Sequence, residues 1–148
     1  MNVTRRIKNL TRHIKQERDR GTIAGFLPCV LTSVTEAASK FGLTDASECY
    51  KEIDDVEAVM VLTRVLHNGL AYTSDEIMPL AEARNLAASF IAEFSNVPAR
   101  FFTNGNWGSP RAAEAGRSWH PATSSTFDAG VVVLSDHGIG CVWCMDED

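Results

Sequence analysis

The chain has 148 residues, of which 45% are hydrophobic and 22% are charged, and its formal net charge is −5. This length is typical of one domain that buries its core without disulfides or metal, so we expect a single domain over residues 1–148. No apolar run approaches the ~18 residues of a membrane span, and the acidic total argues against a general nucleic-acid binder.

The N-terminal segment has the composition of an amphipathic helix rather than that of an export signal. Seven of the 14 Lys and Arg residues lie in the first twenty positions, and this stretch lacks a continuous apolar region and a small-residue cleavage site. The four cysteines are therefore expected to be free thiols, and we predict a cytoplasmic protein.

Apolar spacing predicts a first helix over about residues 3–19, with Gly21 as its stop. The apolar positions fall on one stripe, which consists of Val3, Ile7, Leu10 and Ile14. Because the stripe is narrow, this helix could pack within the chain or against a second copy, so the sequence allows a homodimer through the first helix.

Capping residues predict four further helices, because each start has a Ser, Thr or Asp of the kind that accepts hydrogen bonds from a first turn. The predicted starts are Ser33, Thr44, Asp54 and Thr73. Pro79 could shift the last start to about residue 78. The helix over residues 56–66 is apolar on most sides and is expected to be the central buried helix.

The pattern changes to that of strands near residue 100. Residues 100–103 suit a short strand, and residues 129–134 and 139–145 suit a hairpin in which Gly138 is free to take positive φ. Residues 131–134 are apolar without alternation, which indicates a strand covered on both faces. We predict an α+β fold, in which an N-terminal layer of about four to five helices packs on a small C-terminal antiparallel sheet that contains the hairpin.

The segment between these strands, residues 104–126, is the strongest candidate for a site. A loop of that length in a compact domain is usually functional or disordered. Its aromatic and basic residues are Trp107, Arg111, Arg117, Trp119 and His120. Indole rings stack on flat ligands, guanidinium groups bind phosphate or carboxylate, and an imidazole N–H donates a hydrogen bond.

These five residues predict a non-catalytic binding protein, such as a small inhibitor or sequestering protein, without a cofactor. Its partner would be a small anionic, nucleotide-like ligand or another protein, bound through the 104–126 loop. The competing interpretation is a lid, in which the tryptophans cap the edge of the core and the arginines face water.

Two other functional classes stay open. A small hydrolase or transferase could use His120 with Asp128 or a nearby serine, although the chain has no nucleophile-elbow or zinc-protease motif. A protein-interaction module is the third alternative. Cys141 and Cys144, preceded by His137, have the spacing of metal ligands, but alternation along a strand puts the two thiols on opposite faces, so we expect buried thiols and no metal.

The charged residues are segregated along the chain. Basic residues on the polar side of the first helix could contact phosphates, but a solvated face is the simpler interpretation; they are Arg5, Lys8, Arg12 and Lys15. The acids of residues 45–57 suit helix caps better than a mimic of a phosphate backbone. The last three residues, Asp146, Glu147 and Asp148, are expected to form a solubilising tail.

Overall fold

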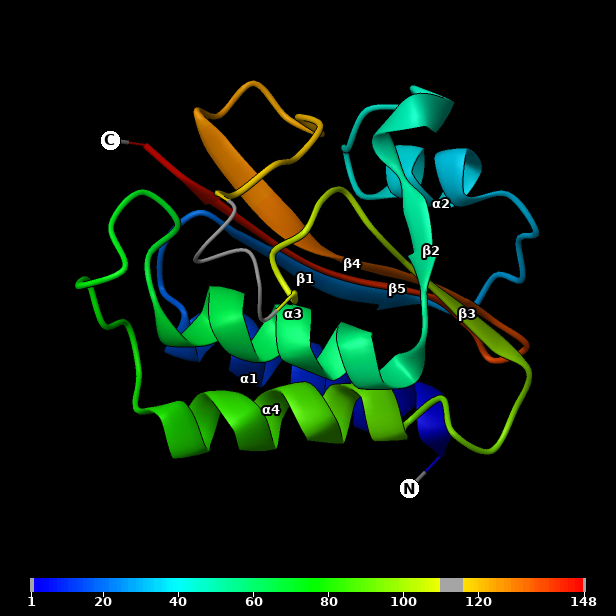
Figure 1. Ribbon diagram of the computed structural model, residues 1–148. Coiled ribbons are helices and arrows are strands. Elements are labelled where there is room, and N and C mark those ends of the chain that lie inside the picture. Colours follow the sequence, from blue (N-terminus) through cyan, green and yellow to red (C-terminus); the bar gives the residue numbers. More distant parts are fainter. Residues whose placement is uncertain (1, 110–115, 148) are drawn as a thin grey trace.

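The computed structural model describes residues 2–109 and 116–147, which form one antiparallel sheet with helices on both faces (Figure 1). The described helices are α1 (Val3–Glu17), α2 (Val34–Lys40), α3 (Asp55–His67) and α4 (Leu80–Ala92), with a short 3-10 helix, η1 (Ser47–Cys49). The strands are β1 (Thr22–Leu27), β2 (Lys51–Ile53), β3 (Ala99–Thr103), β4 (Phe127–Ser135) and β5 (Gly138–Asp146).

The sheet has the order β1-β5-β4-β3-β2, and every neighbouring pair is antiparallel. The predicted hairpin is confirmed: β4 and β5 are joined by a turn between Ser135 and Gly138, and Gly138 has a φ of 141°. β4 is also the middle strand, as its continuous apolar run predicted. Both of its faces are covered because helices pack on both sides of the sheet.

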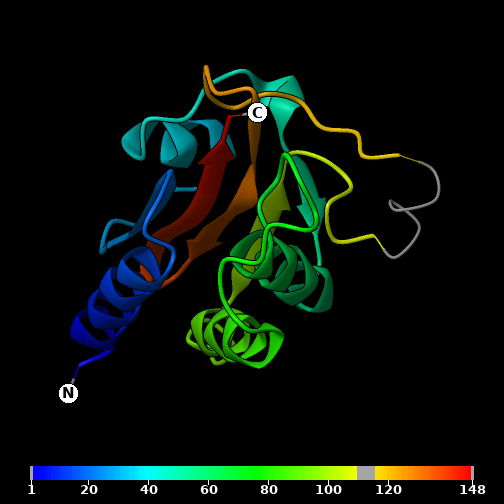
Figure 2. The ribbon, with the colours of Figure 1, turned by 90° about the vertical axis from the view of Figure 1, so that its left-hand side faces the viewer.

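Alternate residues of β4 and β5 belong to two separate cores. One face of the sheet packs against α1, α3 and α4, and the other packs against α2 and η1 (Figure 2). Cys144 lies in the first core and Cys141 in the second, so the two thiols point to opposite faces, as strand alternation predicted. Burial of each Val, Leu or Ile side chain here contributes about 1.5–3 kcal/mol.

The local signals for α1, α2 and α3 are confirmed. Asn2, Ser33 and Asp54 cap the three helices with their side chains, and Gly21 follows α1 with a φ of 45°. Ile7 and Ile14 of the predicted stripe are fully buried, so α1 presents its apolar side to its own chain. None of the helices in the described ranges is both long enough and apolar enough to cross a membrane.

Three fold predictions need correction. The sheet is not confined to the C-terminal part, because β1 and β2 come from segments that predicted no strand. The described ranges contain four α-helices, within the predicted number of about four to five, but α2 lies apart from the others, on the opposite face of the sheet. α4 begins at Leu80 rather than Thr73, close to the alternative start at about residue 78 that Pro79 indicated. The residues before it form turns and an isolated bridge between Asn68 and Glu76.

The predicted acidic tail is also wrong for Asp146, which is the last residue of β5 and is buried. Its carboxylate lies 3.0 Å from the guanidinium of Arg18. This residue therefore belongs to the interior of the fold and does not serve solubility.

Candidate functional site

The two described arms of the 104–126 loop pair with each other. Gly105 and Trp119 form an antiparallel bridge, the N–H of His120 donates to the carbonyl of Asn104 at 2.8 Å, and the N–H of Asn106 donates to the carbonyl of Ser118 at 3.0 Å. A Cβ at Gly105 would lie 2.2 Å from the carbonyl oxygen of Ser118, so only glycine allows this approach. The base of the loop is thus fixed by backbone hydrogen bonds.

The side chain of Asp128, on β4, anchors the second arm of the loop to the sheet. Its buried carboxylate accepts hydrogen bonds from Nδ2 of Asn104 at 2.9 Å, Oγ1 of Thr123 at 2.9 Å and Nε1 of Trp143 at 3.1 Å. The side chain of His120 is exposed, and no hydrogen bond joins it to Asp128 in the described ranges. The carboxylate therefore holds the loop, and these contacts do not assemble a His–Asp dyad.

The first arm lies directly on α3. A Cβ at Gly108 would approach Cγ2 of Val61 to 2.7 Å, so this glycine lets the loop backbone touch the helix. Trp107, beside it, is only 3% exposed and joins the core. Its ring centroid lies 5.3 Å from that of Trp119, which lies 5.5 Å from that of Phe127. Trp107 therefore has little ring surface left for a ligand to stack on.

Two guanidinium groups approach the ring of Trp107. Cζ of Arg117 lies 5.0 Å and Cζ of Arg64 lies 5.6 Å from its centroid, both within the range of a cation–π contact. The pKa of Arg64 is lowered from 12.5 to about 10, chiefly by burial and in smaller part by repulsion from Arg117 and Arg18. Burial also lowers the pKa of Arg117. Both shifts mean that this environment disfavours the two positive charges.

These arginines line a cavity of about 450 Å³ between α3, the start of α4 and the first arm of the loop, which we call the arginine site. Its other basic residues are Arg84 and His67. None of the described residues that line it is acidic, and Arg64, Arg84 and Arg117 form no ion pair with any described carboxylate. The indole N–H of Trp107 is buried without an acceptor among the described residues. The site is thus rich in hydrogen-bond donors and positive charge.

The structure divides the predicted site residues. Trp107 and Arg117 line the arginine site, whereas Trp119 and His120 line a separate cavity of about 240 Å³ beside η1 and β2. Arg111 lies outside the described residues. The four described residues of the predicted site therefore do not line one pocket.

Sequence reasoning missed the helical half of the arginine site. Arg64 lies on α3 and Arg84 on α4, and neither belongs to a motif or to a run of basic residues in the sequence. A signal for Arg64 was present, since a lone arginine in a helix expected to be buried needs a partner or an access to solvent.

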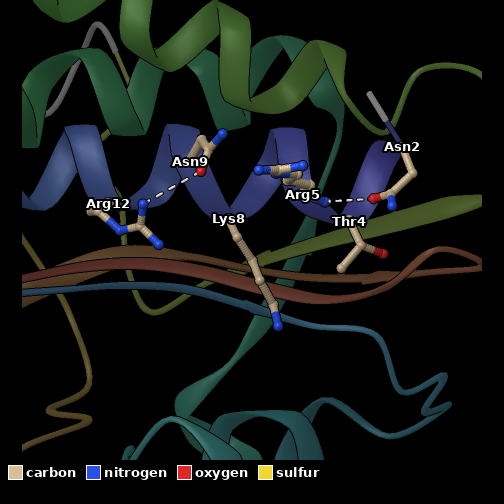
Figure 3. A pocket seen from close by; sticks show the side chains of 6 residues that line it. All are labelled: Asn2, Thr4, Arg5, Lys8, Asn9 and Arg12. Carbon is tan, nitrogen blue, oxygen red and sulfur yellow. Dashed lines mark hydrogen bonds between the residues drawn. The ribbon is translucent and has the colours of Figure 1, made fainter.

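The basic face of α1 forms a second cationic surface. Figure 3 shows Arg5, Lys8 and Arg12 along the outside of the helix, where Nη1 of Arg12 donates to Oδ1 of Asn9 at 3.4 Å. This surface is made by one helix alone and shares no residue with the arginine site. It offers control positions for changes of charge.

Among the described residues, no group of three or more His, Cys, Asp or Glu side chains is placed to hold a metal ion. Comparisons with models of protein families, with curated proteins and with solved structures found no significant match to this chain.

Proposed function

We propose that the protein is a non-catalytic binding protein that holds an anionic ligand in the arginine site. The observation that carries the proposal is the pair Arg64 and Arg117, two half-buried cations on one indole ring that form no ion pair with a described carboxylate. A phosphate or carboxylate placed between them would remove their repulsion and accept charge-assisted hydrogen bonds, each of about 1.5–3 kcal/mol.

The walls of the site favour a ligand that also has an apolar part. Met60 and Leu80, which border the cavity, are 39% and 43% exposed. Arg84 stands at the exposed rim, where it can meet a second negative group. A volume of about 450 Å³ is within the usual range for small-molecule sites.

Binding without turnover is the simpler role for this site. Asp128, the carboxylate expected in a catalytic pair with His120, is occupied by donors that hold the loop. A sequestering or inhibitory protein in the cytoplasm needs only the complementary charge and shape, without an acid or a base poised for proton transfer.

The test is a calorimetric titration with phenyl phosphate, which combines a dianion with a flat apolar ring, beside phenol and inorganic phosphate. We expect phenyl phosphate to bind more tightly than either fragment, and Arg64→Gln and Arg117→Gln each to weaken it by about tenfold or more. Lys8→Gln on α1 removes the same charge outside the site and should leave binding unchanged. Equal losses in all three variants, or no binding of phenyl phosphate, would refute the site.

A further inference from the structure

A larger cavity adjoins the arginine site. It has a volume of about 710 Å³ and lies between the first half of α3, the second half of α4 and strands β2 and β3. Val59 lines both cavities, so together they follow α3 from its start to its end; we call this surface the α3 groove. Figure 1 shows α3 and α4 side by side and running in opposite directions.

The groove holds most of the exposed large hydrophobic residues of the described structure. The exposed large hydrophobic residues of the whole described structure are Val30, Val56, Met60, Tyr72 and Leu80. Three of the five, Val56, Met60 and Leu80, border the groove, and Val56, in the first turn of α3, is 65% exposed. Clustered exposed apolar residues mark interaction sites more often than scattered ones do.

The two ends of the groove carry opposite charge. At the start of α3 the lining includes the acids Glu52, Asp54 and Asp55, and at the other end it includes the three arginines. Arg100 pairs with Glu52, so two acids remain without an ion pair to a described residue at that end. A ligand that fills the whole groove must therefore be acidic at one end and neutral or basic at the other.

The chemistry that matches this pattern is that of a peptide. Eight residues of helix separate Val56 from Arg64, which corresponds to about 12 Å, the length of about four extended residues or two helical turns. A small anion would occupy only the arginine site. A nucleic acid presents phosphates along its entire length, and the acidic end would repel them.

We propose that the α3 groove docks a short segment of a partner protein, with acidic side chains on the arginines and apolar side chains over Val56, Val59 and Met60. The inference rests on the proposed function, because its acidic end occupies the arginine site. It adds the class of ligand, a peptide, and the direction in which the charges lie.

The experiment selects displayed random peptides of about twelve residues on the full-length protein and then measures synthetic copies of the enriched peptides by fluorescence anisotropy. Val56→Gln removes an exposed apolar contact in the groove. Val30→Gln is the matched control, because Val30 is 59% exposed and lies outside the groove. Arg64→Gln tests the acidic end.

We expect the enriched peptides to place acids at one end and large apolar residues next to them. Their affinity should fall by about tenfold in Val56→Gln and in Arg64→Gln, and it should not change in Val30→Gln. If no peptide is enriched, the proposal that the α3 groove docks a peptide is overturned.

The remaining outcomes separate this inference from the proposed function. If only Arg64→Gln weakens the peptides, the groove is overturned and the anion site survives. If only Val56→Gln does, the peptides bind by apolar contact alone, and both the acidic anchor and the proposed anion site are overturned. If Val30→Gln weakens them equally, the binding is not in the groove and the inference is overturned.

Discussion

Nη2 of Arg18 lies 3.0 Å from Oδ2 of Asp146, and both side chains are buried. The same carboxylate oxygen accepts the N–H of Leu70 at 2.7 Å, and Nε of Arg18 donates to the carbonyl of Val65 at 2.8 Å. One ion pair therefore ties the end of α1 to β5, to the last turn of α3 and to the segment that follows α3.

Asp146→Ala should destabilise the protein by about 3–5 kcal/mol, because it leaves the guanidinium of Arg18 buried without its counter-charge. Urea unfolding followed by circular dichroism measures this change. Glu52→Ala is the control, since it removes an ion pair with Arg100 that is exposed to solvent, and it should have little effect on stability. Equal losses of stability in both variants would show that the contribution of the Arg18–Asp146 ion pair does not depend on its burial.

Asp128→Asn should destabilise the protein by about 3 kcal/mol, because the new amide group places a donor against the N–H and O–H groups that now donate to the carboxylate. Hydrogen exchange should also become faster at the amide of Thr123, which donates to Asp128 at 3.1 Å. Asp136→Asn, at an exposed position of the hairpin turn, is the matched control. Unchanged exchange at Thr123 would contradict the anchoring role.

How far the sequence predicts this fold depends on whether a signal is local. The caps Ser33 and Asp54 and the turn at Gly138 act within a few residues, so α2, α3 and the hairpin could be predicted. β1 and β2 are edge strands whose existence depends on pairing with β5 and β3, far away in the chain. Gly25 within β1 weakens a strand pattern in the sequence, whereas in the sheet the ring of Phe41 lies over this glycine.

The residues of the candidate site, too, could be predicted only where the signal is local in the sequence. The composition of the loop indicated Trp107 and Arg117, because both are local features of an unusual segment. Arg64 reaches the ring of Trp107 only because the loop lies on α3, a contact that depends on Gly108 and on the packing of the whole helix. No spacing in the sequence reports that distance, so the helical half of the site could not be derived from it.

Arg64→Met should separate stability from binding. The pKa of Arg64 is lowered from 12.5 to about 10, so the folded state disfavours its cation. The resulting cost in stability is fully present near neutral pH, and it declines only as the pH rises from about 10 towards 12.5. Methionine retains much of the side-chain volume without the charge. We expect the melting temperature of Arg64→Met near pH 7 to equal or exceed that of the wild type, while binding of phenyl phosphate is lost.

Arg18→Met makes the same chemical change at a paired arginine and is the comparison for Arg64→Met. It leaves the buried carboxylate of Asp146 with only the more exposed Arg20, 3.5 Å away, so the melting temperature should fall clearly below that of the wild type. A similar fall in both variants would mean that Arg64 is a structural residue rather than a binding one.

Alkylation with iodoacetamide near pH 8 should modify Cys29 first and leave the other three cysteines for the unfolded state. Cys49, Cys141 and Cys144 are buried, and burial raises the pKa of Cys49 and of Cys144 to about 11. About one in a thousand of such thiols is ionised at that pH, and the thiolate is the reactive form.

Mass spectrometry should show one fast adduct, absent in Cys29→Ser, and three slow ones that appear on addition of urea. A fast adduct on Cys49 would show that the contact of its thiol with the carbonyl of His120, at 3.3 Å, opens in the native protein, and with it the base of the loop.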